Sequence, residues 1–191
     1  MRRPLLALIG PSGAGKSTVA RTLADRWVIR LHPTWTTRER RADELDGSPE
    51  HRFVSDEEFL RRRHEGFFLH TVQMFGLPAW YGLPSIEWAD HGPVDCVMLR
   101  AGLVPQMKQF HPNVLVYQID APSHLLTQRL CQRSYEPAEL HARLRDNDDE
   151  KVSGRRIADR RFNLAFGPTA CADAIERWLR HDAELVHGAV L

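Results

Sequence analysis

Residues 10–17, near the start of the chain, have the types and spacing needed to bind a triphosphate. They read Gly-Pro-Ser-Gly-Ala-Gly-Lys-Ser and fit the pattern G-x-x-x-x-G-K-[ST]. The glycines let the backbone curl so that its N–H groups face phosphate oxygens. Lys16 would add positive charge at the β- and γ-phosphates, and Ser17 would offer a hydroxyl to Mg²⁺. We therefore predict an ATP site, with Mg²⁺ as cofactor, formed by Ser12, Gly13, Ala14, Gly15, Lys16, Ser17 and Thr18.

This loop needs a buried strand before it and a helix after it, and the sequence predicts both. Residues 5–9 are a continuous apolar run that is typical of a strand buried on both faces. Residues 15–26 have a helical pattern that would place Val19, Leu23 and Trp27 on one side. A chance match to the loop pattern arises in about one chain in a hundred, and this context makes chance remote. The loop alone would suit a kinase, a GTPase or an ATPase equally.

The rest of the chain predicts an α/β fold with an insertion. Apolar runs at 94–99, 114–119 and 162–166 alternate with helical patterns, which indicates βαβ units. We expect a P-loop NTPase fold with three α/β/α layers and a parallel central sheet. Residues 33–86 are rich in charge, glycine and proline, and we interpret them as an inserted lobe. The core would then comprise residues 1–32 and 87–191.

Composition narrows the class of protein. The 191 residues are 42% hydrophobic and 27% charged with a net charge of +1, which favours one globular unit over a nucleic-acid or membrane binder. No stretch is long and apolar enough to cross a bilayer. The three cysteines are far apart and fit reduced thiols better than disulfides or a metal site. We predict a cytoplasmic monomer or homodimer whose partners are small molecules, not nucleic acid or membrane.

The order of further motifs resembles the guanylate kinase family across most of the chain. The matching segments are residues 10–18, 36–41, 46–47, 53–55 and 81–82, followed by Arg129, Arg133 and Arg143. The resemblance implies that the lobe binds a phosphorylated acceptor, whose phosphate would contact Thr37, Arg38, Arg41 and Tyr81. Two arginines three residues apart beside a hydroxyl also suit bidentate phosphate binding. An exposed charged loop is the commoner fate of such a run, and it stays an alternative.

The positions that read guanine in that family differ in this chain. They hold His70, Leu83 and, approximately, Leu99. The N1–H and amino groups of guanine need hydrogen-bond acceptors, and a leucine supplies none. An unpaired buried donor costs about 1–3 kcal/mol, so the loss of several such contacts predicts poor use of GMP.

Ribose 1,5-bisphosphate phosphokinases, a sister family, resemble this chain at those places. The likeness lies in residues 47–51, 76–77 with 81–82, and 100–106. It implies that His51 and Arg100 face the acceptor, and a cation at position 100 suits a second phosphate. A surface histidine at 51 and an ordinary strand-end ion pair at 100 are the alternatives.

Arg129, Arg133 and Arg143 have the spacing of lid arginines in both families. This implies a short lid, at about 133–140, that closes over ATP bound by Arg129 and Arg133. Lys16, Arg38, Arg133 and Arg143 would then be the catalytic residues that stabilise charge on the migrating phosphoryl group. A surface salt bridge would explain Arg129 or Arg143 taken singly. Asp120, at a strand end, is the candidate carboxylate for Mg²⁺ through water.

Together these features predict an ATP-dependent kinase with a phosphate group as acceptor. The leading acceptor is ribose 1,5-bisphosphate, which would give phosphoribosyl diphosphate, and the alternative is GMP, which would give GDP. An alternative of another class is a non-catalytic nucleotide-binding module, since some guanylate-kinase-like domains are scaffolds. The intact phosphate loop argues against that alternative.

Overall fold

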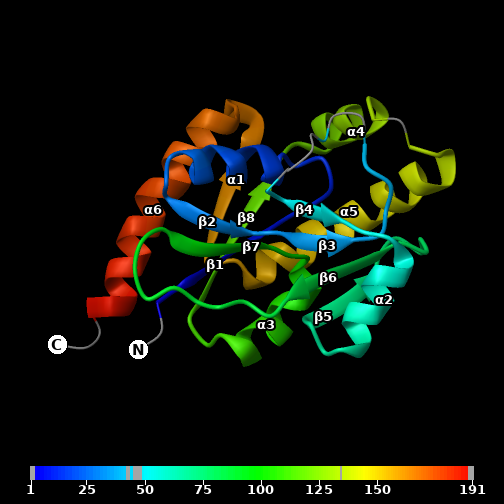
Figure 1. Ribbon diagram of the computed structural model, residues 1–191. Coiled ribbons are helices and arrows are strands. Elements are labelled where there is room, and N and C mark those ends of the chain that lie inside the picture. The colour runs from blue at the N-terminus through cyan, green and yellow to red at the C-terminus, as the bar shows by residue number, and fades with distance from the viewer. Residues whose placement is uncertain (1–2, 42–43, 45–48, 134, 189–191) are drawn as a thin grey trace.

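A fully parallel, five-stranded sheet forms the centre of the molecule in a computed structural model of the chain (Figure 1). The structure describes residues 3–41, 44, 49–133 and 135–188, with side chains up to Asp182. The strand order is β2-β7-β1-β8-β9. The strands are β1 (Leu5–Ile9), β2 (Ile29–His32), β7 (Val94–Met98), β8 (Val114–Asp120) and β9 (Arg160–Asn163).

Helices cover both faces of this sheet, because side chains alternate along each buried strand. Leu6 and Leu8 of β1 face one hydrophobic cluster, whereas Leu5, Ala7 and Ile9 face the other. The helices of the core are α1 (Lys16–Asp25), α3 (Val104–Phe110), α4 (Ser123–Cys131), α5 (Pro137–Ile157) and α6 (Pro168–Gly188). The three-layer α/β/α fold with a parallel sheet is therefore confirmed.

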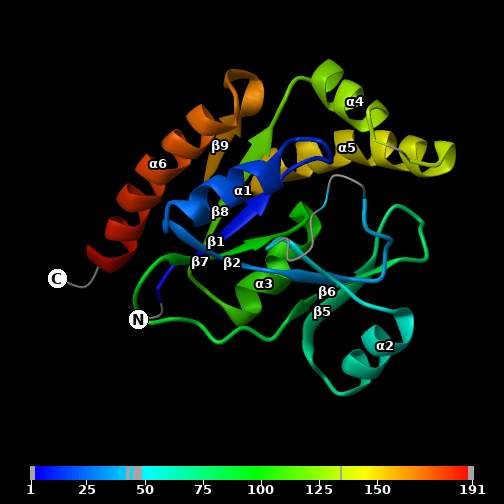
Figure 2. The same cartoon turned by 45° about the horizontal axis from the view of Figure 1, so that its top comes forward.

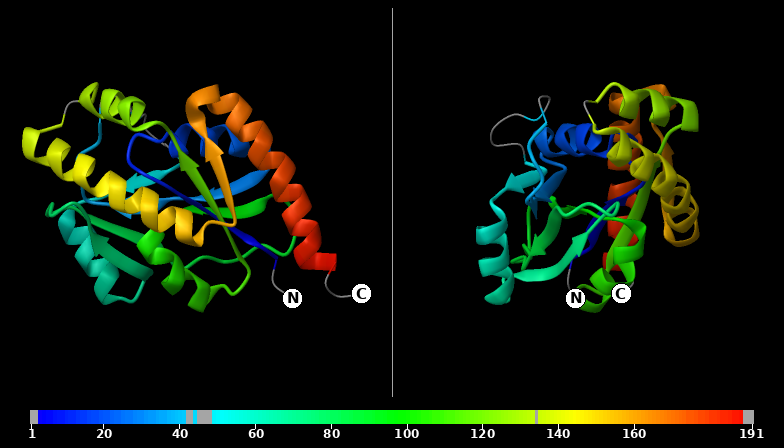
Figure 3. Two further views of the ribbon diagram at one scale, coloured as in Figure 1. Left: turned by 180° about the vertical axis from the view of Figure 1, so that it is seen from behind. Right: turned by 90° about the vertical axis from the view of Figure 1, so that its right-hand side faces the viewer.

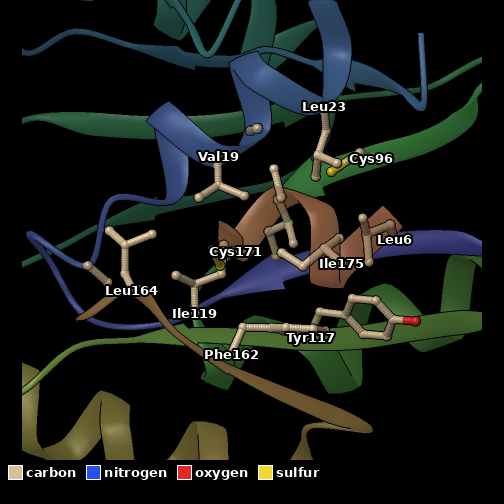
Figure 4. Close-up of a cluster of buried hydrophobic side chains, with 14 of the residues drawn as sticks. Leu6, Val19, Leu23, Cys96, Tyr117, Ile119, Phe162, Leu164, Cys171 and Ile175 are labelled. Atoms are coloured by element: carbon tan, nitrogen blue, oxygen red, sulfur yellow. The ribbon is translucent and has the colours of Figure 1, made fainter. Parts of the chain in front are cut away.

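Each face has its own helices. Val19 of α1 and Ile175 of α6 lie in the first cluster together with Leu6 (Figure 4). Met107 of α3 and Ile157 of α5 contribute to the second cluster. Figure 2 shows α1 and α6 together on one side of the sheet, and the rear view in Figure 3 shows α5 crossing the other side.

Two local predictions are wrong. The strand expected at 162–166 is β9, which ends at Asn163, followed by a 3-10 turn over Leu164–Phe166. The Asn163 side chain accepts a hydrogen bond from the Ala165 N–H at 2.9 Å, and this local bond competes with strand pairing. Trp27 does not face the core beside Val19, because α1 ends at Asp25 and Trp27 is 73% exposed with φ of 59°.

Residues between β2 and β7 build a second sheet at one end of the first, on the right in Figure 1. Its order is β4-β3-β6-β5, with the helix α2 packed on β5. The elements are β3 (Thr34–Thr36), β4 (His51–Phe53), α2 (Asp56–His64), β5 (Phe68–Gln73) and β6 (Trp80–Pro84). The Ser55 hydroxyl caps the start of α2, since it accepts from the Glu58 N–H at 3.2 Å.

The carboxyl ends of β1, β7 and β8 lie at one edge of the central sheet, where parallel α/β folds bind ligands. Residue 10 follows β1, and residue 99 follows β7 at the same edge. Within the described residues, no helix combines the length and the apolar character that crossing a membrane requires. The fold therefore brings the phosphate loop and the end of β7 to a common edge.

Candidate active site

The phosphate loop has the curled backbone that its sequence predicts. Gly13 and Gly15 have φ of 80° and 84°, values that favour residues without a Cβ atom, and α1 begins directly after them. The Lys16 Nζ donates to the backbone oxygens of Gly10 at 2.6 Å and Pro11 at 3.0 Å. The ammonium group is therefore held inside the loop, next to the place where inward-facing amides would receive phosphate oxygens.

Asn147 of α5 fixes the loop from outside. Its side-chain oxygen accepts from the Ser12 N–H at 2.7 Å, and its amide group donates to the Ser12 carbonyl at 3.0 Å. Sequence reasoning missed this residue, because α5 reads simply as a charged helix. The signal was nevertheless present: Arg143, Asn147 and Glu150 recur at helical spacing, and all three are buried.

A cavity of about 240 Å³ joins the loop to the second sheet. All four predicted catalytic residues line it, namely Lys16, Arg38, Arg133 and Arg143. Its wall also includes Ser12, Gly13, Ala14, Gly15, Ser17, Thr18, Arg41, His51, Tyr81 and Arg100. These residues come from both sheets and from the region around α5, so the fold gathers most of the predicted site into one space.

Burial affects the charge of Lys16 in this cavity. It lowers the pKa of Lys16 from 10.5 to about 8, and the charges of Arg100 and Arg133 act in the same direction against Glu150. Burial is thus the main effect that opposes protonation of Lys16, and the two arginines add to it. Such a site is stabilised by a polyanion, because the negative charge of the ligand offsets the repulsion.

Arg38 and Arg41 lie side by side on one carboxylate. The Glu44 carboxylate accepts from both terminal nitrogens of Arg38, one of them at 2.7 Å, and from the Arg41 N–H at 3.0 Å. Only 9% of the Arg38 side chain is exposed, and its buried Nε has no hydrogen-bond partner among the described residues. A carboxylate and a phosphate make similar bidentate contacts with arginine, so this pair has the geometry to bind a phosphate group.

A second hollow, of about 970 Å³, also borders the loop at Gly13, Gly15 and Thr18. Arg129 and Thr18 line it together with Leu164 and Pro168, and Arg129 also donates to the Gly13 carbonyl at 3.2 Å. Arg38, Arg41, Arg133 and Arg143 border both spaces. Thr37 borders this second hollow and not the first, and its hydroxyl accepts from the Trp80 N–H at 3.1 Å.

The chain matches the sequence model described as guanylate kinase over residues 1–142. It belongs to the guanylate kinase family. It is 35% identical over 144 residues to a guanylate kinase of Symbiobacterium thermophilum, covering 73% of this chain and 67% of that protein. It is also 31% identical over 144 residues to ribose 1,5-bisphosphate phosphokinase PhnN of Burkholderia mallei, covering 73% of this chain and 76% of that protein.

A solved structure supports the fold. A guanylate kinase from Anaplasma phagocytophilum superimposes with a TM-score of 0.71 at 23% identity, covering 95% of this chain and 86% of the other. The family model and the similar proteins confirm the recognition of a guanylate kinase-like P-loop kinase from sequence, and this structure agrees with its fold. The chain is a kinase of this family, and the family relationship does not choose between the acceptors of its relatives.

The positions that read guanine in the guanylate kinase family offer little to guanine here. His70 and Leu99 line the first cavity, whereas Leu83 is fully buried in the hydrophobic core. Burial lowers the pKa of His70, which favours a neutral ring. Among the described residues that line this cavity there is no aspartate or glutamate. Much of the remaining wall is apolar and consists of Val72, Met74, Phe75, Met98, Leu99 and Leu103.

His51 and Arg100 both line this cavity, as the likeness to the sister family implies. Burial, helped by the charge of Arg38, lowers the pKa of His51 to about 4, so the ring is neutral near pH 7. Its buried Nδ1 has no hydrogen-bond partner among the described residues. Arg100 forms ion pairs with Asp146 and, at 3.1 Å, with Glu150. An acceptor would therefore have to share Arg100 with two carboxylates. Residues 47 and 48 of the sister-family likeness lie outside the described residues.

The site offers one of the two residues predicted to contact Mg²⁺. Ser17 lines the cavity beside Lys16. Its hydroxyl oxygen would be the ligand to Mg²⁺ that the chain supplies, and the phosphates of ATP would supply further oxygen ligands. Asp120 borders neither space, and it pairs with Lys151 at 3.4 Å and Arg155 at 3.5 Å. The described residues contain no cluster of three metal-binding side chains. The geometry therefore favours Ser17 over Asp120 as a contact for the ion.

Acid should test the contact between Glu44 and the two arginines. Burial would raise the pKa of Glu44, but hydrogen bonds from Arg38 and Arg41 outweigh it and lower the pKa from 4.5 to about 2. A carboxyl whose folded pKa is depressed stabilises the fold above its unfolded pKa, and this contribution is lost as the pH falls through the folded value. We expect Glu44→Gln to lose stability relative to wild type at pH 6 and to converge with it towards pH 2.

Urea unfolding at pH 6, 4 and 3 measures this difference in free energy. Glu57→Gln on the exposed start of α2 is the matched control and should show no such convergence. Equal stability of Glu44→Gln and wild type at pH 6 would show that Glu44 does not bind the arginines in solution.

Proposed function

We propose that this kinase transfers the γ-phosphoryl group of ATP to a phosphate of ribose 1,5-bisphosphate, which gives phosphoribosyl diphosphate. One observation carries the choice of acceptor: seven cations and no described carboxylate line the first cavity. The cations are Lys16, Arg21, Arg38, Arg41, Arg100, Arg133 and Arg143. This set of cations suits an acceptor with two phosphates bound beside ATP, and the described wall lacks a carboxylate that would accept both the N1–H and the amino protons of guanine.

The proposed acceptor residues Arg38, Arg41 and Tyr81 border both the cavity of about 240 Å³ and the hollow of about 970 Å³. Residues 33–86 would form the acceptor-binding lobe, and residues at about 133–140 would form the lid over ATP.

In the proposed reaction an oxygen of the acceptor phosphate attacks the γ-phosphorus, and the bond to the β–γ bridging oxygen breaks, which releases ADP. Arg38 and Arg41 bind the attacking phosphate of the acceptor, with Tyr81 nearby. Lys16, Arg133 and Arg143 surround the migrating group and stabilise its spread charge. When bound, Mg²⁺ supplies further positive charge to the triphosphate, with Ser17 as its contact on the chain. An ATP-consuming reaction of this kind fits a cytoplasmic protein, which remains a prediction.

Guanylate kinase activity is the second candidate, because the matching family model and several of the similar proteins carry that name. Under this alternative the same arginines would bind the phosphate of GMP. The base would then lie against an apolar wall, with His51 and His70 as its polar neighbours.

Measurement of ADP release with ribose 1,5-bisphosphate, GMP and dGMP separates these functions. We expect kcat/KM for ribose 1,5-bisphosphate to exceed that for GMP at least tenfold, with phosphoribosyl diphosphate identified by mass spectrometry. Arg100→Met should lower kcat/KM for the bisphosphate more than for GMP, since only the former needs a second cation. A preference for GMP would establish guanylate kinase activity instead. Tight ATP binding without turnover of any acceptor would favour the non-catalytic module.

A further inference from the structure

Three arginines and two aromatic rings lie in a continuous series of cation–π contacts at the active site. The Arg41 guanidinium carbon is 5.2 Å from the centre of the Tyr135 ring, and that of Arg143 is 4.7 Å from the same ring. Arg143 also lies 4.2 Å from the centre of the Phe75 ring, and Arg100 lies 5.3 Å from it. We refer to these five residues as the arginine–aromatic stack.

The stack joins parts of the fold that are distant in sequence. Arg41 and Phe75 belong to the segment that carries the second sheet, whereas Arg100 follows β7 of the central sheet. Tyr135 lies between α4 and α5, and Arg143 is buried on α5. The stack therefore spans the proposed acceptor lobe, the proposed lid and the core.

Tyr135 has a second contact that reaches the other lid arginine. The Arg133 guanidinium donates to its hydroxyl at 3.3 Å. Arg41, Arg133 and Arg143 thus all contact one side chain, and all three border both spaces around the phosphate loop. Tyr135 itself borders only the second hollow, so it is placed to act through the arginines.

The three arginines of the stack contact carboxylates as well as aromatic rings. Arg41 contacts Glu44, Arg143 contacts Glu139, and Arg100 contacts Asp146 and Glu150. The aromatic rings add a face against which a planar guanidinium rests, and they do so without placing negative charge where phosphates must bind.

Phe75 lies in a turn between β5 and β6. Its φ is 63° and that of Gly76 is 66°, and the Leu77 N–H closes the turn on the Met74 carbonyl at 3.1 Å. The turn therefore sets this backbone conformation, and it places the Phe75 ring against Arg143 and Arg100.

We propose that Tyr135 and Phe75 are positioning residues that hold Arg41 and Arg143 so that ATP and the acceptor are contacted together. The proposal rests on the proposed function for the assignment of these arginines to the two phosphates. It does not depend on which phosphorylated acceptor is used, because every member of the stack is a residue of the chain.

Variants at position 135 separate the ring from the hydroxyl. Tyr135→Leu removes both, and we expect kcat to fall roughly tenfold. Tyr135→Phe retains the ring and should keep most of the rate. A merely structural role at this half-buried site would not require the ring itself for the rate. Phe166→Leu is the control, since Phe166 is 82% exposed and borders neither space. Equal rates for Tyr135→Leu and wild type would overturn the proposal, and so would a Tyr135→Phe variant as slow as Tyr135→Leu.

A double-variant cycle tests whether the rings act through Arg143. Phe75→Leu should also cost roughly tenfold in kcat, because it removes the other ring that contacts Arg143. In an Arg143→Met background, Tyr135→Leu should have a much smaller effect than in wild type. An undiminished effect in that background would show that the ring does not work through this arginine.

A measurement without acceptor keeps this proposal distinct from the proposed function. Calorimetry with Mg²⁺ and a non-hydrolysable ATP analogue should show several-fold weaker binding for Tyr135→Leu than for Tyr135→Phe, since Arg133 and Arg143 border the loop. Absence of turnover with every acceptor would defeat the proposed function but leave this binding test in place. Should Tyr135→Leu fail to fold, Phe75→Leu takes its place in the same titration. Identical affinities of these variants for the ATP analogue would overturn the positioning role proposed for the two rings.

Discussion

Lys16→Met should lower the rate of ADP formation on the order of 10³-fold while the protein remains folded. The Lys16 Nζ lies inside the loop, bound to the Gly10 and Pro11 carbonyls, where no other described lysine borders the cavity. ATP would draw it to the phosphates, and methionine has no charge to replace it. The fold should tolerate the change, because burial already opposes the ammonium charge and lowers the pKa of Lys16 to about 8.

The same pKa makes the binding of ATP depend on pH. Below pH 8 the lysine of the nucleotide-free protein is protonated, and ATP meets a full positive charge. Above pH 8 it has lost its proton, so ATP binding must take one up, and the affinity should fall as the pH rises. Calorimetry at pH 8.5 in two buffers with different ionisation enthalpies measures this uptake.

Two variants set the limits of this prediction. Lys16→Met should bind ATP without that proton uptake, whereas Lys108→Met, on the exposed side of α3, should behave as wild type. Unchanged turnover in Lys16→Met, or the same proton uptake as in wild type, would contradict the placement of Lys16 on the triphosphate.

The parts of the fold that follow from local patterns were predictable from the sequence. The apolar run of β1 and the glycine pattern after it are adjacent in the chain, so the loop and its helix could be located from residue types alone. The strand predicted at 162–166 failed because a single side-chain bond from Asn163 turns the chain, and such a bond leaves no periodic signal. The predicted position of Trp27 in the core was wrong because α1 ends two residues before it.

The site itself depends on contacts that the sequence does not encode locally. Asn147 lies 135 residues from Ser12 in the chain, yet both of its side-chain hydrogen bonds go to that residue. Arg100 looked available for a second phosphate, and only the structure shows that Asp146 and Glu150 already contact it. Residue types at family positions thus predicted which side chains gather, but not which partners they have before a ligand arrives.

Arg38→Met and Arg41→Met should each raise KM for the acceptor about 100-fold and change KM for ATP less than about threefold. Both side chains border the first cavity on the side of the second sheet, where they converge on Glu44 with bidentate geometry. A phosphate that replaced or joined the Glu44 carboxylate would receive charge-assisted hydrogen bonds from both. Steady-state kinetics with each substrate varied in turn measures the two constants.

The two arginines should differ in what their loss does to the fold. Arg38 is the more enclosed, so Arg38→Met leaves Glu44 without its bidentate partner, and that variant should be the less stable. Arg38→Met combined with Glu44→Gln removes both charges and should recover stability without recovering acceptor affinity. Arg63→Met, on the exposed face of α2, is the control for loss of an arginine in the same segment. A loss of ATP affinity that equals the loss of acceptor affinity would contradict the division of labour proposed for the cavity, because Arg38 and Arg41 would then bind the donor.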